Sequence, residues 1–351
     1  MVIDPHRHLA AKQRWQPVEF AFWFATLLPF VLIPTYLTLA SQIAITAIFA
    51  VSLDLILGYA GLVSLGHAAY FGLGAYTAGL IAKAGWGEPF SGLLLAGTAS
   101  GLFGWLTGFI VVRVRHLALI MITLGIGLLL YEVANRESWL TGGNDGLQGV
   151  TMWPLFGWFD FDLYGYTAYA YALAILLLVV LAARRLVHSP FGLSLRAIRE
   201  NERRMPAIGA PSRTRLRAIY TIAATIAGIA GGLLAQTTEF VSLGALSFER
   251  SAELIVILVI GGTGRLYGGI IGAIVYLVAR DRLSGMNPQY WYFWIGLMLI
   301  GVVLFLPNGI LGGLAVLHRH SRASRNSGPQ HRTVPLGSGL RGNDDEGAAP
   351  S

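Results

Sequence analysis

The residue types that carry out catalysis are scarce in this sequence and form no known catalytic pattern. The chain has no cysteine, which excludes disulfides, thiolate nucleophiles and Cys-based metal sites. It also lacks a Gly-x-x-x-x-Gly-Lys-Ser/Thr phosphate loop, an HExxH pair and a Gly-x-Ser-x-Gly elbow. His6 and His8, like His318 and His320, are alternate-residue pairs in polar segments and predict no metal site. We therefore expect neither an enzyme nor a bound metal or cofactor.

Four ionisable residues lie within or at the ends of apolar segments, namely Asp54, His67, Glu132 and Glu253. A charge at the centre of a membrane helix costs about 3 kcal/mol on insertion scales, so such residues need a partner or a role. Asp54 precedes Gly58 and can accept hydrogen bonds from backbone amides freed at a glycine break, or it can line a solute route. We expect His67 to lie near the membrane interface, and both glutamates to reach water from helix ends.

The composition indicates that lipid surrounds most of the chain. Hydrophobic residues make up 55% of the sequence and charged residues 12%, and the mean hydropathy is +0.61. A spanning helix needs about 20 mostly apolar residues. We predict an all-α membrane protein, a polytopic bundle of about ten transmembrane helices with Gly-broken segments. The expected spans lie near residues 20–37, 41–57, 66–83, 90–112, 117–133, 166–183, 218–236, 252–262, 266–279 and 290–306.

The predicted organisation has three parts. Residues 1–18 form an N-terminal segment, 19–313 form the transmembrane domain, and 314–351 form a tail with too few apolar residues to fold. If the N-terminus lies inside, the inner segments, including loop 184–217, carry 20 Lys and Arg, whereas the outer segments, including loop 135–165, carry 5. The positive-inside rule then predicts an inner-membrane protein with both termini in the cytoplasm. The net charge of +7 is scattered over these segments, so we do not expect nucleic acid binding.

Two glycine-rich breaks follow predicted spans, Gly58-Tyr59-Ala60-Gly61 and Gly261-Gly262-Thr263-Gly264. Glycine permits sharp turns and close approach of helices. One interpretation is tight helix packing. The other is a pair of broken or re-entrant elements, at corresponding positions of a parallel repeat, that line a route near the membrane midplane. Under this second interpretation the pathway candidates are Asp54, Tyr59, Ser64, His67, Tyr70 and Thr123.

Loop 184–217 contains a predicted amphipathic helix. Its apolar face is expected to comprise Leu193, Ala197 and Ile198, and its polar face Arg196, Arg199, Glu200 and Arg203. Ser189 or Ser194 can cap the start of this helix, and Gly209 can end it. Spacing alone leaves two roles open, because such a helix can lie on anionic lipid or fit a groove on a soluble partner.

Four ordered stretches between about residues 39 and 313 resemble a known family. The run from Ser189 to Glu202, Ser-Pro-Phe-Gly-x-x-Leu-Arg-Ala-Ile-Arg-Glu-Asn-Glu, is similar to the cytoplasmic coupling segment of branched-chain amino acid ABC transporter permeases of the LivM type. The other similar stretches are 58–66 with 74–76, 123–125 with 140–146, and 261–264 with 307–312. Pro206 departs from the family's pattern and predicts an end or kink of the helix near Met205.

The resemblance implies the permease subunit of an ATP-driven ABC importer for branched-chain amino acids. The implied partners are a second homologous permease subunit, two ABC ATPase subunits, a periplasmic solute-binding protein and membrane lipid. It implies that the ATPases are coupled to the spans through Leu195, Arg196, Ile198, Arg199, Glu200, Glu202 and Gly209. Leu195 and Ile198 are expected to anchor in an ATPase groove, with Arg199 and Glu200 at its rim.

Two alternatives remain open. One is an ABC permease for urea, short-chain amides or another small organic acid. The other is an ion-coupled secondary transporter, which would be expected to carry paired charges deep within its spans.

Overall fold

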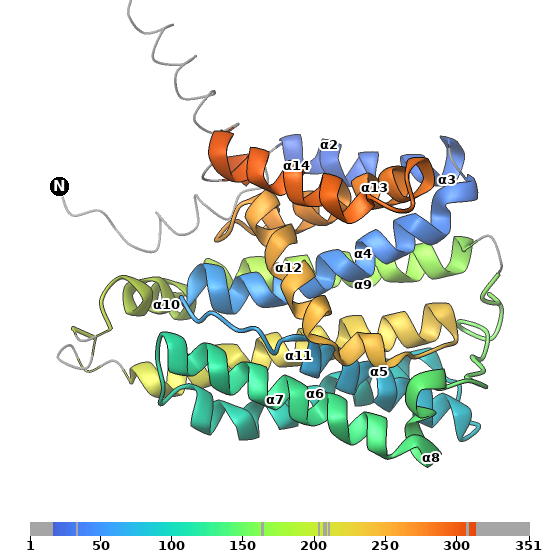
Figure 1. Ribbon diagram of the computed structural model, residues 1–351, viewed down its shortest axis with the longest axis horizontal. Helices are drawn as coiled ribbons and strands as arrows, with labels where there is room; N and C mark the ends of the chain where they lie inside the picture. Colours follow the sequence, from blue (N-terminus) through green and yellow to red (C-terminus); the bar gives the residue numbers. More distant parts are fainter. Residues whose placement is uncertain are drawn as a thin grey trace, which may run out of the picture. The chain divides into compact units, whose positions relative to one another are not determined.

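The structure is helical across the residues that it describes, which are 17–32, 34–162, 165–202, 204–205, 209, 211–306 and 309–313. In this computed structural model, the only extended pairings within those ranges are two isolated β-bridges, Leu147 to Val241 and Leu155 to Phe159. The α-helices (Figure 1) are α2 (Pro17–Ala25), α3 (Leu28–Leu32), α4 (Leu37–Asp54), α5 (Ala68–Lys83), α6 (Pro89–Val111), α7 (Leu117–Arg136), α8 (Ser138–Thr141), α9 (Tyr166–Val187), α10 (Pro190–Glu200), α11 (Ser212–Thr238), α12 (Phe248–Gly261), α13 (Gly268–Met286) and α14 (Trp291–Phe305). A π-helical turn, η2 (Leu55–Tyr59), continues α4. Short 3-10 turns are η1 (Pro34–Tyr36), η3 (Gly143–Asp145) and η5 (Leu243–Leu246).

The all-helical class is confirmed for the described residues, but the count of about ten spans is not. Within the part of the chain that the structure describes, six segments are long and apolar enough to cross a membrane: Pro34–Tyr59, Pro89–Val111, Leu117–Arg136, Tyr166–Val187, Ser212–Thr238 and Trp291–Gly313. The first expected span is divided into the short helices α2 and α3, and α5 and α12 have only 16 and 14 residues. α13 is long enough, but Arg280, Asp281 and Arg282 make its last third polar. The chain is thus a multi-pass membrane protein in which several apolar helices are shorter or more polar than these six segments.

The core forms around α11, which packs against α4, α5 and α6. Small residues make this packing close. A Cβ atom on Gly74 of α5 would lie only 2.5 Å from the Cα of Gly228 in α11, so the two backbones meet without side chains between them. Since lipid tails are as apolar as leucine, helices in membranes associate chiefly through such close contacts. The result is a rigid frame for the neighbouring broken segments.

Helices α5 and α12 begin inside the bundle, and α12 is steeply inclined to α4, α9 and α11 (Figure 1). Ser100, midway along α6, donates a hydrogen bond to the Tyr70 carbonyl at 2.8 Å, which places the first turn of α5 level with the middle of α6. The Ala68 amide donates to Ser251 Oγ at 2.9 Å, so the first turn of α12 lies at the same level. Non-helical backbone at this depth requires protein or a water-filled cavity around it. For the first glycine break, this favours the interpretation as a broken element.

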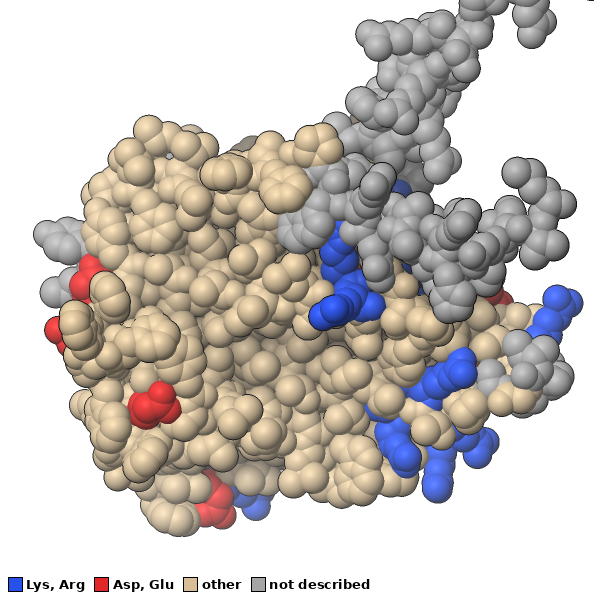
Figure 2. All heavy atoms as spheres, turned by 180° about the vertical axis from the view of Figure 1, so that it is seen from behind, with Lys and Arg blue, Asp and Glu red and all other residues tan. Residues whose placement is uncertain are grey.

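Charged residues are distributed unevenly on the molecular surface. On the face visible in Figure 2, most Lys and Arg side chains lie toward one end and most Asp and Glu side chains toward the other, with an uncharged zone between them. This pattern is consistent with the asymmetry counted in the sequence. The orientation of the chain remains a prediction. The predicted segment 1–18 and tail 314–351 lie outside the described residues, apart from positions 17 and 18.

Candidate functional site

The two glycine breaks meet each other, although about 200 residues separate them in the sequence. Asp54 is the last residue of α4 and is 2% exposed, and its Oδ1 accepts a hydrogen bond from the Gly264 amide at 2.7 Å. A Cβ atom on Gly58 would lie 2.5 Å from that amide nitrogen and closer still to the aspartate oxygen, so only glycine fits there. Asp54 does accept from a freed backbone amide, as one interpretation expects, but the amide belongs to the other break. We call the contact of Asp54, Gly58 and Gly264 the glycine junction.

The amphipathic helix predicted in loop 184–217 is α10. Ser189 is its N-cap, with Oγ accepting from the Gly192 amide at 3.3 Å, as one of the two capping alternatives predicted. Leu195 and Ile198 are 2% and 3% exposed and pack into the permease's own core, whereas Leu193 is 45% exposed. The predicted apolar face is therefore wrong at Leu193. The predicted end at Gly209 is also wrong, because α10 ends at Glu200; Pro206 and Arg203 lie outside the described residues.

Basic side chains of α10 connect this helix to the first break. The guanidinium of Arg199 donates through Nη1 to the carbonyl of Gly58, although much of the Arg199 side chain is exposed. The guanidinium of Arg196 lies 5.1 Å from the centre of the Tyr59 ring, a cation–π contact. These contacts therefore connect α10 directly to the backbone of the glycine junction.

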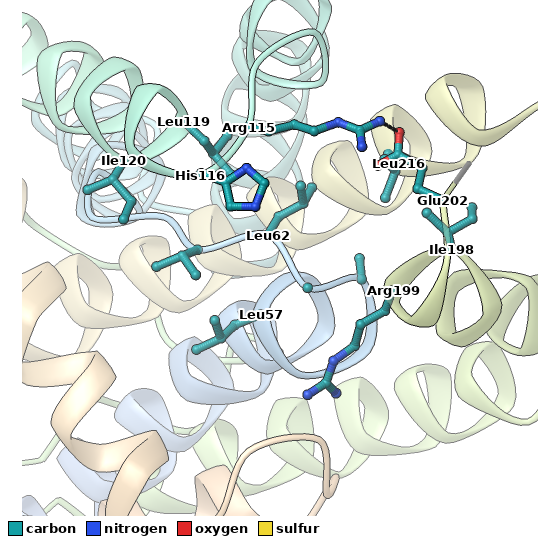
Figure 3. Close-up of a pocket in the computed structure, with 13 residues that line it drawn as sticks. Leu57, Leu62, Arg115, His116, Leu119, Ile120, Ile198, Arg199, Glu202 and Leu216 are labelled. Atoms are coloured by element: carbon teal, nitrogen blue, oxygen red, sulfur yellow. Dashed lines mark ion pairs between the residues drawn. The ribbon is translucent and has the colours of Figure 1, made fainter. Parts of the chain in front are cut away.

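A cavity of about 510 Å³ adjoins this connection. Leu57, residues 60–63, the start of α7 with the turn before it, and the end of α10 with Glu202 line it together with Leu216 of α11, as Figure 3 shows. Arg115 and Glu202 form an ion pair at its edge, which links the segment after α10 to the turn before α7. His116 in that turn has φ 53°, a left-handed conformation that side chains seldom adopt. The cavity thus lies between the segment after α4, the start of α7 and the end of α10. The Arg115–Glu202 ion pair and the hydrogen bond from Arg199 to Gly58 join these segments at its rim.

The other predicted pathway residues form buried polar contacts beside the first break. His67 Nε2 lies 2.8 Å from Ser52 Oγ, and its ring stacks on Phe49, so His67 lies in the bundle interior and the expectation of an interfacial histidine is wrong. The Tyr70 hydroxyl bonds Tyr220 at 2.7 Å and Thr107 at 2.8 Å.

Thr123 holds the extended segment between η2 and α5. Its Oγ1 accepts from the Leu65 amide at 3.2 Å, and the neighbouring Ser64 is also buried. Of the six pathway candidates, none lines the 510 Å³ cavity, and a pathway role for them remains a prediction.

One charged cluster was not predicted from the sequence. Glu253 accepts from Arg250 Nη1 at 2.9 Å and from Arg280 Nη1 at 3.0 Å. Glu253 was expected to reach water from a helix end, but its side chain is only 15% exposed and both of its oxygens are paired with arginine. Glu132 does lie near the end of α7, where it is exposed and pairs with Arg136. The i, i+3 spacing of Arg250 and Glu253 was visible in the sequence, but the approach of Arg280 was not.

These features together define a class. Apolar spans, helices that begin within the membrane and a charged surface helix attached to a glycine junction are the parts of a polytopic transport subunit. The family model described as "Branched-chain amino acid transport system / permease component" matches residues 35–303, and the chain belongs to this family.

Relatives of known name agree with that membership. The chain is 30% identical over 306 residues to the high-affinity branched-chain amino acid transport system permease protein LivM of Salmonella typhimurium, covering 81% of this chain and 71% of the relative. The LivM protein of Escherichia coli gives the same identity and coverage. The autoinducer 2 import system permease protein LsrC of Yersinia enterocolitica is 27% identical over 252 residues, covering 67% of this chain and 64% of LsrC. No solved structure is significantly similar.

Proposed function

We propose that this chain is the permease subunit of an ATP-driven ABC importer in the inner membrane and forms part of the path for branched-chain amino acids. In this proposal the importer also contains a second homologous permease subunit, two ABC ATPase subunits and a periplasmic solute-binding protein. The names of the LivM relatives support the substrate class. The lack of a phosphate loop in the sequence supports placing ATP hydrolysis in separate subunits.

The contact between Arg199 and Gly58 carries the proposal. Energy from a separate ATPase must enter the permease through a surface element, and α10 is the surface helix attached to the glycine junction. A shift of α10 moves the Gly58 carbonyl, and Gly58 is in contact with the backbone of Gly264. The same shift therefore reaches α4 and the segment between α12 and α13.

The burial pattern changes the expected docking surface of α10. Leu195 and Ile198 are buried within the permease, so they fix α10 to its own subunit and are not available to a partner's groove. Leu193 and Glu200 are exposed. We assign Leu193 as the apolar anchor for the ATPase and Glu200 as a rim contact, and Arg199 as the link inward.

Two alternatives have specific support. The likeness to LsrC favours a path for another small solute. The paired charges of Arg250, Glu253 and Arg280 are the kind of feature that an ion-coupled carrier would need. One uptake assay that varies the energy source and the solute distinguishes both alternatives from the proposed function.

The test is uptake of radiolabelled leucine by proteoliposomes that contain the complete complex. We expect uptake to require ATP and the binding protein, and to persist when ionophores collapse proton and sodium gradients. Leu193→Asp should abolish assembly with the ATPases, whereas Leu128→Asn, a polar change on an exposed position of α7, should preserve it. Uptake that is independent of ATP and lost with the ionophores would establish an ion-coupled carrier instead. ATP-driven uptake of autoinducer 2 but not of leucine would establish the other solute class.

A further inference from the structure

The cluster of Arg250, Glu253 and Arg280 carries one formal positive charge in excess. Both oxygens of Glu253 are occupied, Oε2 by Arg250 and Oε1 by Arg280. The side chains are 22%, 15% and 43% exposed, respectively. A guanidinium has five N–H donors, and each arginine uses Nη1 for the glutamate. The cluster thus has donors left over for a further acceptor.

The depth of the cluster follows from its neighbours. The Arg250 guanidinium lies 5.5 Å from the centre of the Phe71 ring. Phe71 follows Tyr70, whose carbonyl accepts from Ser100 midway along α6. α6 has 23 residues and is about 35 Å long at 1.5 Å per residue, which matches a hydrocarbon core of about 30 Å. The Arg250 end of the cluster therefore lies level with the middle of α6, whereas Arg280 contacts Trp291 at the start of the span Trp291–Gly313 and lies nearer the membrane edge.

The Arg250 end of this net-positive cluster is partly exposed, which is unfavourable in contact with lipid tails. Ionisable residues in spans almost always face a bundle interior or a water-filled cavity, and they mark solute pathways. Apolar rings border the two guanidiniums, with Phe71 beside Arg250 and Trp291 5.6 Å from Arg280. Positive donors beside apolar surface suit a small carboxylate with an apolar side chain, because arginine donates in a planar fork that matches a carboxylate.

We propose that Arg250 and Arg280 form a binding site for the carboxylate of the transported solute, between the middle of α6 and the start of α14. Glu253 holds the two guanidiniums in place, and the surplus donors bind the solute. The site deepens the proposed function and rests on it, since a branched-chain amino acid supplies both the carboxylate and the apolar side chain. The solute class is therefore small aliphatic carboxylates.

The cysteine-free chain allows a direct test through Ser284→Cys. Ser284 lies one turn after Arg280 on α13 and is partly exposed. In the assembled complex we measure the ratio of the modification rate by the anionic reagent MTSES to the rate by the cationic MTSET. We expect this ratio to be at least five times higher for Ser284→Cys than for Asn144→Cys, which lies in an exposed loop. Leucine and 4-methylpentanoate should slow the modification, and leucinol, which lacks the carboxylate, should not.

Matched variants on the same helix complete the design. Arg280→Gln should abolish protection by 4-methylpentanoate and reduce leucine uptake at least ten-fold, whereas Arg282→Gln should change both by less than two-fold. Arg282 contacts the Tyr36 ring instead. The site would be overturned by an unreactive cysteine, by the absence of a charge preference, or by equal protection with leucinol. The measurements on Ser284→Cys remain valid even if Arg280→Gln does not fold. ATP-driven leucine uptake without carboxylate protection would overturn the site alone, whereas protection without ATP-driven uptake would overturn the proposed function alone.

Discussion

The glycine junction gives the sharpest mutational prediction, the effect of Gly58→Ala. The added methyl would meet the Gly264 nitrogen at 2.5 Å, whereas ordinary contacts of this kind begin near 3.4 Å. The obstacle is backbone, so it cannot rotate away as a flexible side chain would. The two breaks must separate by about 1 Å, which also weakens the hydrogen bond from Gly264 to Asp54.

The magnitude follows from these two effects. Overpacking a filled site by one methyl costs about 1–3 kcal/mol. Weakening of the hydrogen bond to Asp54 adds at most about 0.5–1.5 kcal/mol. A total of about 2 kcal/mol corresponds to a fall in Tm of about 2–4 °C, because the shift for a chain of 351 residues lies at or below the lower end of the range of about 2–4 °C per kcal/mol found for 150–250 residues.

Thermal unfolding of the purified protein in detergent measures this effect. Gly125→Ala on α7 is the matched control, because a Cβ atom there meets nothing within 4 Å, and helix propensity should raise its stability slightly. Uptake by the Gly58→Ala complex should fall together with Tm. A Gly58→Ala protein with the wild-type Tm and wild-type uptake would show that the glycine junction is not closely packed in the working transporter.

Three other predictions concern coupling, orientation and pH. Arg199→Met should lower solute-stimulated ATPase activity about five-fold, which is equivalent to about 1 kcal/mol after allowance for the exposure of Arg199. The control Arg185→Met should change this activity by less than two-fold. Equal effects of the two variants would refute the link between Arg199 and Gly58. An impermeant thiol reagent added to intact cells should label Asn144→Cys and not Glu200→Cys, and the reverse pattern would invert the topology. Partial burial raises the pKa of Glu88, but hydrogen bonds from Ser91 and Phe90 outweigh it and hold the pKa below its ordinary value of 4.5. Because the pKa is lowered in the folded state, the stabilisation by Glu88 is complete above pH 4.5 and is lost as the pH falls below it. The Tm of the wild type should therefore fall more steeply than the Tm of Glu88→Gln between pH 5 and pH 3. Parallel curves of Tm against pH would exclude Glu88 as a stabilising N-cap of α6.

The sequence predicted the helical class and the amphipathic helix because both depend on local pattern. The Ser189 cap, the positions of six spans and the two glycine breaks are all readable from periodicity and glycine content. The family resemblance in the stretch 189–202 was equally local. These predictions needed no knowledge of which segments meet in space.

The remaining features depend on contacts between distant segments. Nothing near Asp54 indicates that its partner is the amide of Gly264, and nothing near Glu253 indicates the approach of Arg280. The count of about ten spans was not confirmed, because apolar content does not reveal where a helix begins. α5 and α12 are apolar enough to suggest spans, yet both begin halfway along α6.

The hydrogen bond from Ala68 to Ser251 has a consequence for biogenesis. At about 5–20 residues per second, the ribosome needs about 10–40 s to make the 183 residues between these positions. During that interval the start of α5 has reached the translocon, but Ser251, the acceptor of the Ala68 amide, has not been synthesised. The interval between the synthesis of Asp54 and that of Gly264 is longer still. The first half of the chain therefore remains an incomplete substrate for insertion, one that chaperones or membrane proteases can recognise, until the last third emerges.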